Sequence, residues 1–171
     1  MTEQNDSINF PLDASYEASS PPFGVSFFLK KHLISHVKLF ESSTFICNIY
    51  GHSSLQKDIL AWIQSYLQKK TPKPLPLDLT SLSLFTQKGL KAIQAIPFGQ
   101  TAPYQEVAIQ AGNPKAARAI GGVCNRNPFP LIIPCHRVIG ANQTLGGFAY
   151  NLNLKKIIIG FENCKIKFNY K

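Results

Sequence analysis

Residues 104–123 read YQEVAIQAGNPKAARAIGGV, and this stretch decides the fold class of the second half of the chain. It predicts a short helix over residues 104–111, a turn at Gly112-Asn113-Pro114 and a second helix over residues 115–123. A helix, a short turn and a helix form the outline of a DNA-reading helix-turn-helix. Many helical hairpins contact no nucleic acid, so the outline alone is weak evidence of DNA binding.

The segments before this stretch predict a small strand-rich part. β-branched and aromatic residues favour strands over 23–30, 33–40 and 44–49, and the alternation within 33–40 favours a sheet with one wetter face. A Ser53-Ser54 cap begins a helix that runs to about residue 70. Its apolar stripe consists of Leu55, Ile59, Trp62, Ile63 and Tyr66.

Residues 71–76, TPKPLP, form a stiff linker, and the chain after it reads as helices broken by turns. Helices are expected over 84–96 and 151–162, on either side of the helix-turn-helix. In the last helix, the residues expected to point inward are Leu152, Leu154, Ile157, Ile158 and Phe161. We therefore expect a flexible arm over 1–22, an N-terminal α/β subdomain over 23–76 and a mainly helical C-terminal domain over 77–171.

Positive charge is concentrated in the second half. The chain of 171 residues carries a formal charge of +9, with seven basic and six acidic residues over 1–77 and eleven basic and three acidic residues over 78–171. Such a field attracts polyanions, of which nucleic acid is the commonest large one. A solvated basic face without a partner explains the charge equally well.

The composition excludes several other classes of protein. With 44% hydrophobic residues the chain can bury a core, so it is not a disordered basic tail. No apolar run approaches the roughly 20 residues that a membrane span needs, and the polar start, MTEQND, does not resemble a secretory signal. The four cysteines form no C-x-x-C pair, which favours reduced thiols and a cytoplasmic protein.

The candidate for chemistry is a cysteine within residues 132–140, IIPCHRVIG. Cys135 is followed by His136 and Arg137, and cationic neighbours are expected to lower the pKa of its thiol. A buried structural cysteine is the plain alternative. A Cys–His hydrolase is disfavoured because adjacent side chains usually point apart, and a zinc site lacks ligand pairs at the usual spacing.

The same segment resembles a known family, the O6-alkylguanine-DNA alkyltransferases, also called methylated-DNA–protein-cysteine methyltransferases. The similar motifs are PCHRV at 134–138, IPFGQT at 96–101 with Tyr104, GNPKAARAIGG at 112–122, Asn127-Pro128, and GGFAY at 146–150 continuing through Lys155-Lys156 to Glu162. They are in family order and cover about residues 82–162. The first 75 residues match only in general character.

The resemblance implies a fold and a reaction. The expected fold is a small ribonuclease H-like N-terminal subdomain followed by a winged-helix-like helix-turn-helix domain. Cys135 would take the alkyl group from O6 of guanine in one irreversible turnover, without a cofactor. His136 would act on Cys135 through a water and Glu162 would orient His136, the order of groups that also activates thiol hydrolases. Asn127 would tie the turn that holds Cys135, and Tyr104 would crowd the target phosphate and donate to the guanine ring.

The resemblance also implies that the target base leaves the duplex, because O6 lies inside it. Arg118 would fill the vacated stack, and small residues would let its helix approach the minor groove, although they equally permit tight helix packing. The residues expected to contact DNA are Tyr104, Lys115, Ala116, Ala117, Arg118, Ala119, Gly121 and Gly122. The base pocket is expected at Val138, Gly146 and Gly147, and many relatives have a serine where this chain has Gly146.

The expected partner is double-stranded DNA that contains O6-alkylguanine, bound by a monomer that has no membrane partner. Some relatives hold a structural zinc in the N-terminal unit. Here that region offers only Cys47, His32, His36 and His52, without paired spacing, so we predict no metal. The alternatives are a non-catalytic lesion sensor of the same architecture, a plain DNA-binding regulator and a thiol hydrolase.

Overall fold

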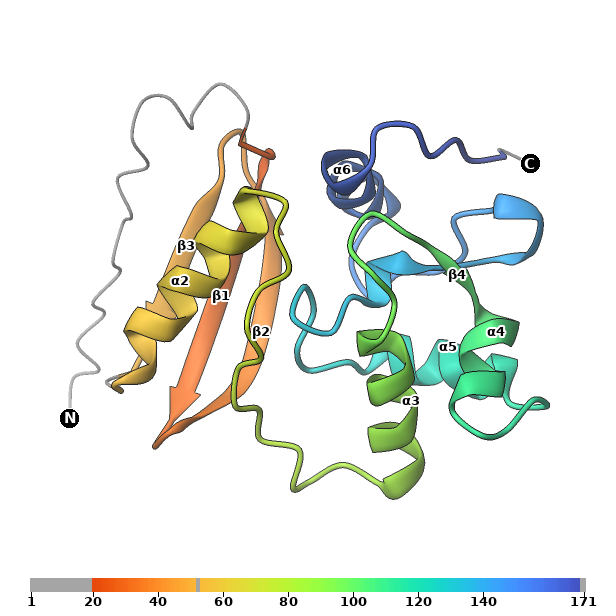
Figure 1. Cartoon of the computed structure of the whole chain (residues 1–171), viewed down its shortest axis with the longest axis horizontal. Helices are drawn as coiled ribbons and strands as arrows, with labels where there is room; N and C mark the ends of the chain where they lie inside the picture. Colours follow the sequence, from red (N-terminus) through yellow and green to blue (C-terminus); the bar gives the residue numbers. More distant parts are fainter. Residues whose placement is uncertain (1–19, 52, 170–171) are drawn as a thin grey trace. The chain divides into compact units, whose positions relative to one another are not determined.

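The computed structural model describes residues 20–51 and 53–169 (Figure 1). It divides into two units, of which the first ends at Asp78 and the second begins at Leu79. Most of the arm expected over 1–22, His52 and the last two residues of the basic tail lie outside the described residues.

The first unit is a three-stranded sheet with one helix beside it (Figure 1). Its central strand β1 (Phe23–Lys30) pairs antiparallel with β2 (Leu33–Glu41) and parallel with β3 (Ile46–Tyr50). The predicted stripe of α2 (Leu55–Leu67) is confirmed, because all five of its residues are buried. The side chain of Ser54 makes no cap hydrogen bond, whereas the Ser53 hydroxyl accepts one from the Leu55 amide at 3.3 Å.

The alternation predicted for β2 is shifted by one residue at its start. The register between β1 and β2 changes between Phe28 and Leu29, so that Phe28 lies opposite His36 and Leu29 lies opposite Ile34. This β-bulge leaves Ser35 as the extra residue, and it turns Ile34 rather than Leu33 toward the core. The phase expected from Val37 onward is found, with Val37 and Leu39 buried.

The second unit is mainly helical. Its helices are α3 (Leu84–Gln94), α4 (Tyr104–Gln110), α5 (Ala117–Asn125) and α6 (Leu152–Glu162). The helix-turn-helix expected from the sequence is α4 followed by α5, and α5 begins at residue 117 rather than 115. Gly112, with φ of +82°, ends α4, and the amides of Gly112 and Asn113 bond back to Ile109 and Ala108 at 2.9 Å each.

Two short elements bring the start of α4 beside the PCHRV motif. The 3₁₀-helix η1 (Cys135–Arg137) runs directly into β5 (Val138–Ile139), which pairs in parallel with β4 (Ala102–Pro103). Because β4 ends one residue before Tyr104 and β5 starts three residues after Cys135, this pairing places the two predicted site residues close together.

The buried face of the last helix agrees with the prediction at Leu154 and Ile158 and differs from it at the other positions. Its buried residues are Leu154, Lys155, Ile158, Ile159 and Glu162, whereas Leu152 is 45% exposed and Ile157 and Phe161 are half-buried. The prediction for Leu152 was wrong because it considered apolar residues alone. Two charged residues, Lys155 and Glu162, belong to the buried face. No helix among the described residues has the length and apolar character of a membrane span.

Candidate functional site

Cys135 begins η1 and lies almost completely inside the second unit. It is 3% exposed. Asn127 shapes the preceding turn, because its Nδ2 donates to the Ile133 carbonyl at 2.8 Å and its Oδ1 accepts from the Phe129 amide at 3.0 Å. The Asn127 side chain also hydrogen-bonds Cys135. One asparagine therefore holds both the turn and its thiol.

The thiol of Cys135 is a protonated group at rest. Burial raises its pKa, while the hydrogen bond from Asn127 and the positive charge of Lys155 act in the opposite direction without overcoming burial. The expectation from the sequence, that His136 and Arg137 as cationic neighbours lower the pKa of this thiol, was wrong. The Arg137 guanidinium binds Glu162 and the Ile96 carbonyl instead. The cation that acts on the Cys135 thiol is Lys155.

Arg137 and His136 both bind one buried carboxylate. Arg137 donates to Glu162 from Nε at 2.8 Å and from a terminal nitrogen at 3.0 Å, and it donates to the Ile96 carbonyl at 2.7 Å. His136 Nε2 lies 2.8 Å from Glu162 Oε1. Glu162 thus joins α6 to η1, and Arg137 joins η1 to the segment after α3.

The charge states of this cluster follow from its contacts. Burial alone would raise the pKa of Glu162, but the contacts with His136 and the two hydrogen bonds from Arg137 lower it to about 2. Burial lowers the pKa of His136, and the carboxylate of Glu162 opposes that shift only in part. The cluster is therefore an anionic Glu162, a cationic Arg137 and a neutral imidazole.

The neutral imidazole has a defined tautomer. An ionised carboxylate can only accept hydrogen bonds, so His136 Nε2 carries the proton and Nδ1 is a bare acceptor. Nδ1 is buried, and no group among residues 20–51 and 53–169 is a hydrogen-bond partner for it. A buried acceptor without a partner, on the residue next to the thiol in the chain, is suited to receive a proton through a water.

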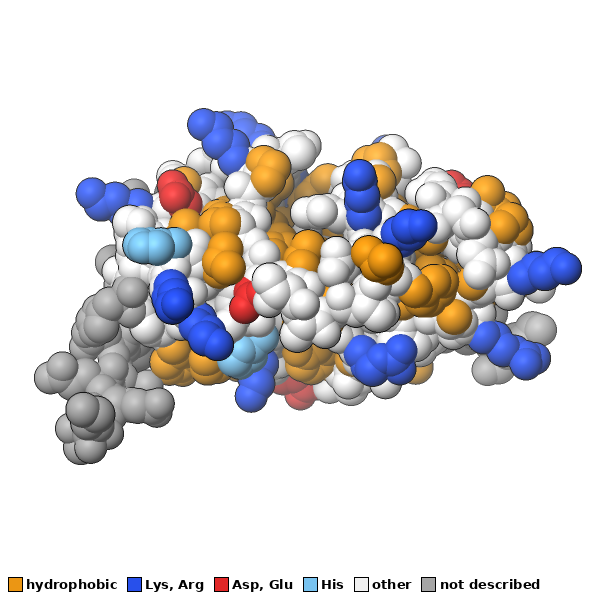
Figure 2. All heavy atoms as spheres, turned by 90° about the horizontal axis from the view of Figure 1, so that it is seen from below, with side chains coloured by type: hydrophobic (Ala, Val, Ile, Leu, Met, Phe, Trp, Pro, Cys, Tyr) orange, Lys and Arg blue, Asp and Glu red, His pale blue; other side chains and the backbone are white. Residues whose placement is uncertain are grey.

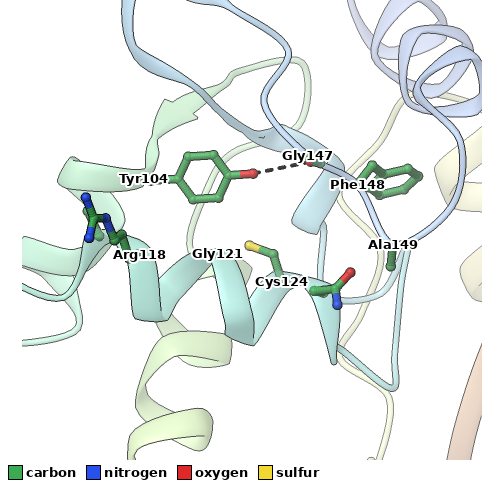
Figure 3. A pocket seen from close by; sticks show the side chains of 9 residues that line it. Tyr104, Arg118, Gly121, Cys124, Gly147, Phe148 and Ala149 are labelled. Atoms are coloured by element: carbon green, nitrogen blue, oxygen red, sulfur yellow. Dashed lines mark hydrogen bonds between the residues drawn. The ribbon is translucent and has the colours of Figure 1, made fainter.

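A cavity of about 490 Å³ lies between α4, α5 and the segment before α6. Figure 3 shows the Tyr104 ring reaching across it, with the hydroxyl donating to the Gly147 carbonyl at 3.2 Å. The Cys135 thiol is close enough to act on the pKa of Tyr104 and of Cys124, both of which are raised to about 12, mainly by burial. The lining residues are Tyr104, Ala117, Arg118, Gly121, Cys124, Asn125, Gly147, Phe148 and Ala149.

Several predicted residues lie outside this lining. Ala116 is buried, whereas Lys115 and Ala119 are exposed and Gly122 lies beside the Arg126 guanidinium. Val138 is buried, and its carbonyl accepts from Lys155. Gly146 has φ of +64°, and a Cβ there would lie 2.9 Å from the Tyr104 ring, so a serine would not fit in this position.

The sequence interpretation did not assign roles to four residues that the structure brings to the site. Cys124, Asn125, Phe148 and Ala149 line the cavity. A fifth, Lys155, is completely buried beside it. One signal could have identified Lys155: it precedes Glu162 by seven residues, or two helical turns, so a helix that turns Glu162 inward also turns Lys155 inward.

On the face of the molecule drawn in Figure 2, basic side chains lie apart from one another and form no single dense patch. The face of the molecule in Figure 2 carries Lys and Arg at many separate places, few acidic side chains, and apolar side chains between them. Arg118, at the cavity edge, is exposed. Within the described residues, no cluster of three or more His, Cys, Asp or Glu side chains could hold a metal ion, and the absence of zinc stays a prediction for a metal assay.

Comparisons with known proteins agree on one family. The sequence profile described as "6-O-methylguanine DNA methyltransferase, DNA binding domain" matches residues 84–164. A methylated-DNA–protein-cysteine methyltransferase of Methanosarcina acetivorans is 47% identical over 46% of this chain and 50% of its own length. A probable methylated-DNA–protein-cysteine methyltransferase of Acanthamoeba polyphaga mimivirus is 39% identical over 62% of this chain and 71% of its own length.

A solved structure resembles most of the chain. Mycobacterium tuberculosis OGT, crystallised in complex with DNA, has a TM-score of 0.65 and 26% identity, over 82% of this chain and 93% of that protein. The curated archaeal relatives are matched over only about half of their own length.

Removing the charge of Glu162 should destabilise the protein. We expect Glu162→Gln to lower the free energy of unfolding by about 3 kcal/mol at pH 7, because it leaves a buried arginine without its anion. The exposed Glu106→Gln in α4 changes charge equally and should have little effect. Urea unfolding of the two variants at pH 7 measures the difference.

The loss of stability in Glu162→Gln should also depend on pH. The folded pKa of Glu162 lies below its ordinary value of 4.5, so the stabilisation is present above about pH 4.5 and is lost as the pH falls toward 2. The difference in the free energy of unfolding between wild type and Glu162→Gln should therefore become smaller over that range. A difference that stays constant down to pH 2 would contradict this assignment.

Proposed function

Since the chain belongs to the methylated-DNA–protein-cysteine methyltransferase family, we propose that it repairs duplex DNA by moving an alkyl group from O6 of guanine to its own Cys135. The observation that carries the proposal is the position of this buried thiol. It lies in the PCHRV motif, one residue from a bare imidazole acceptor oriented by Glu162, and near a cavity on α5 large enough for a base.

The reaction needs a thiolate, and the cluster supplies a way to form one. The Cys135 proton passes through a water to His136 Nδ1, and the resulting imidazolium is stabilised by the anionic Glu162. The sulfur attacks the alkyl carbon in line, the S–C bond forms and the C–O6 bond breaks. The electron pair stays on guanine, which takes up one proton from solvent, and the imidazolium of His136 returns its proton to solvent. The thioether is stable, so each molecule reacts once.

Tyr104 contributes to the departure of the base. Its hydroxyl donates to the Gly147 carbonyl in the free protein and turns to the guanine ring when the base enters the cavity. The high pKa of Tyr104, about 12 and due mainly to burial, keeps this hydroxyl protonated so that it can donate. Asn127 holds the turn that carries Cys135, which lies close to Tyr104 although it is not among the residues that line the cavity.

The DNA-binding part of the proposal rests on α5. The small residues Ala117 and Gly121 line the cavity on the side of this helix, and Arg118 lies at its edge (Figure 3). The alkylated nucleotide leaves the duplex, at a cost of a few kcal/mol, and the Arg118 guanidinium takes its place in the stack. The helix approaches the minor groove, where the base edges give little information about sequence. This suits a repair protein, because the lesion occurs in any sequence.

We also propose a finer description of the fold of each unit. The β2-β1-β3 sheet with α2 supports a ribonuclease H-like first unit, and α4, α5 and the β4–β5 pair support a winged-helix-like second unit. A monomer acting in the cytoplasm stays a prediction. The sensor alternative is disfavoured because such relatives lack the nucleophilic cysteine, and Cys135 is present.

The central test is the position of the transferred group. After incubation with a duplex that contains O6-methylguanine, peptide mass spectrometry should find one methyl group, on Cys135. Cys135→Ala should bind the DNA and remain unmodified. Cys124→Ala is the matched control: it removes a second buried thiol near the same cavity and should still acquire the methyl group on Cys135, because burial raises the pKa of the Cys124 thiol to about 12.

The alternatives predict other outcomes of this experiment. A sensor or a regulator would bind DNA without any mass change, and a thiol hydrolase would turn over esters or peptides without retaining a methyl group. An unmodified Cys135 after complete incubation would exclude the proposed reaction.

The role of Arg118 has its own test. We expect Arg118→Ala to slow repair in duplex DNA at least about tenfold, because the unstacking cost is no longer offset, while the reaction with free O6-methylguanine base changes little. Arg126→Ala loses the same charge at the other end of α5 and should affect duplex repair much less. Rates with the two substrates measure this split, and equal losses on both would show that Arg118 has no part in flipping.

A further inference from the structure

The chain directly after α3 contacts both partners of the buried ion pair between Arg137 and Glu162. The Ile96 carbonyl accepts from Arg137 at 2.7 Å, and the Gly99 amide donates to Glu162 Oε2 at 3.4 Å. Between these two positions in the chain, Phe98 places its ring centre 5.4 Å from the Arg137 guanidinium carbon. The mechanism proposed above gives no role to Phe98 or Gly99.

Two backbone features fix the shape of this turn, residues 96–99. The Gln100 amide donates to the Pro97 carbonyl at 3.1 Å, and Gly99 has φ of +71°. A Cβ on Gly99 would lie 3.3 Å from the backbone carbonyl oxygen of Glu162, which is tighter than most contacts of a Cβ. A glycine is therefore needed here for the left-handed conformation and for the close approach to the end of α6.

Asn163 joins the same turn to α6. It is the first residue after this helix, and its Nδ2 donates to the Gly99 carbonyl at 2.9 Å. Gly99 thus donates to the carboxylate of Glu162 and accepts from the residue that follows Glu162 in the chain. The position of this carboxylate therefore depends on the turn as well as on Arg137.

Phe98 lies against the more exposed partner of the ion pair. The Glu162 side chain is 2% exposed, whereas the Arg137 side chain is 10% exposed. An ion pair weakens where water reaches it, because the effective dielectric constant is higher there. The ring of Phe98 also attracts the guanidinium through a cation–π contact. It therefore both shields Arg137 and holds it in place.

We propose that the turn at residues 96–99, together with Asn163, is a positioning element of the alkyl-transfer site: it fixes the Glu162 carboxylate, which orients the His136 base. This inference rests on the proposed alkyl transfer and adds residues that act through Glu162 without touching the substrate. The imidazolium formed during transfer is stabilised less well by a carboxylate that can move. The turn therefore affects the rate of transfer more than DNA binding, which we assign to α5.

A protein that reacts once allows its rate constant to be separated from its folded fraction. The amount of methyl group transferred at the end of the reaction counts the molecules that are folded, whereas the rate constant describes each of those molecules. A variant that merely unfolds in part lowers the end point and leaves the rate constant unchanged. A positioning role lowers the rate constant itself.

Asn163→Ala removes the hydrogen bond to the Gly99 carbonyl. We expect it to lower the rate constant about tenfold, and by the same factor with free O6-methylguanine base and with an O6-methylguanine duplex, because both reactions use His136. Binding to unmodified duplex should change by less than about twofold. The matched control is Asn153→Ala, at an exposed position of α6, which should react at the wild-type rate.

Phe98→Leu removes the ring and keeps an apolar side chain. We expect it to lower the rate constant about threefold on both substrates, because the cation–π contact is lost. Phe98→Tyr keeps the ring and should react at the wild-type rate. Phe168→Leu, which changes another half-buried phenylalanine of the same unit, is the matched control and should also react at the wild-type rate.

The proton on His136 Nε2 reports the positioning directly. It is buried and bound to Glu162 Oε1 over 2.8 Å, so its exchange with water, followed by NMR, should be slow in wild type. We expect exchange at least about tenfold faster in Asn163→Ala and in Phe98→Leu, and slow exchange in Phe98→Tyr.

Two results would overturn the role of this turn. One is wild-type rate constants and wild-type exchange in both Asn163→Ala and Phe98→Leu. The other is a Phe98→Tyr variant that reacts as slowly as Phe98→Leu. If wild type transfers no alkyl group, the proposed function itself fails, and the exchange measurement still tests the positioning of His136, so the two failures are distinguishable.

Discussion

The second unit depends on one buried carboxylate. Glu162 accepts from Arg137 at two positions and from His136 at 2.8 Å, and these contacts join α6, η1 and, through Arg137, the segment after α3. Removing either charge would leave the other one buried without a partner. The turn that carries Cys135 is therefore held in place by a buried ion pair, together with the hydrogen bonds of Asn127.

The basic groups near Cys135 have different roles in this arrangement. Arg137, although adjacent to Cys135, is used to hold Glu162, while the charge that acts on the thiol comes from Lys155 in α6. Burial still dominates, so the thiol of the free protein is protonated. For a protein proposed to react only once, a resting thiol has an advantage, because oxidants and other electrophiles attack the thiolate. The base beside it, His136, then forms the thiolate where the substrate is bound.

Local patterns predicted the elements well and the buried polar contacts poorly. The stripe of α2 and the α4–α5 hairpin follow from apolar spacing and from a glycine and a proline in the turn, all of which act within a few residues. The start of β2 was shifted because a bulge at Ser35 changes the phase, and bulges depend on the partner strand. Lys155 was overlooked because buried lysines are rare, and its three acceptors lie 8 to 17 residues away along the chain.

The central claim is that His136 is neutral, with its proton on Nε2 and a bare Nδ1 that can accept the Cys135 proton. Nitrogen NMR of protein labelled with ¹⁵N in histidine measures this directly, with a His136→Gln variant to assign the signal. At pH 7 we expect the His136 ring to show one protonated nitrogen, Nε2, and an unprotonated Nδ1. A ring protonated on both nitrogens, or with its proton on Nδ1, could not act as the base and would contradict the claim.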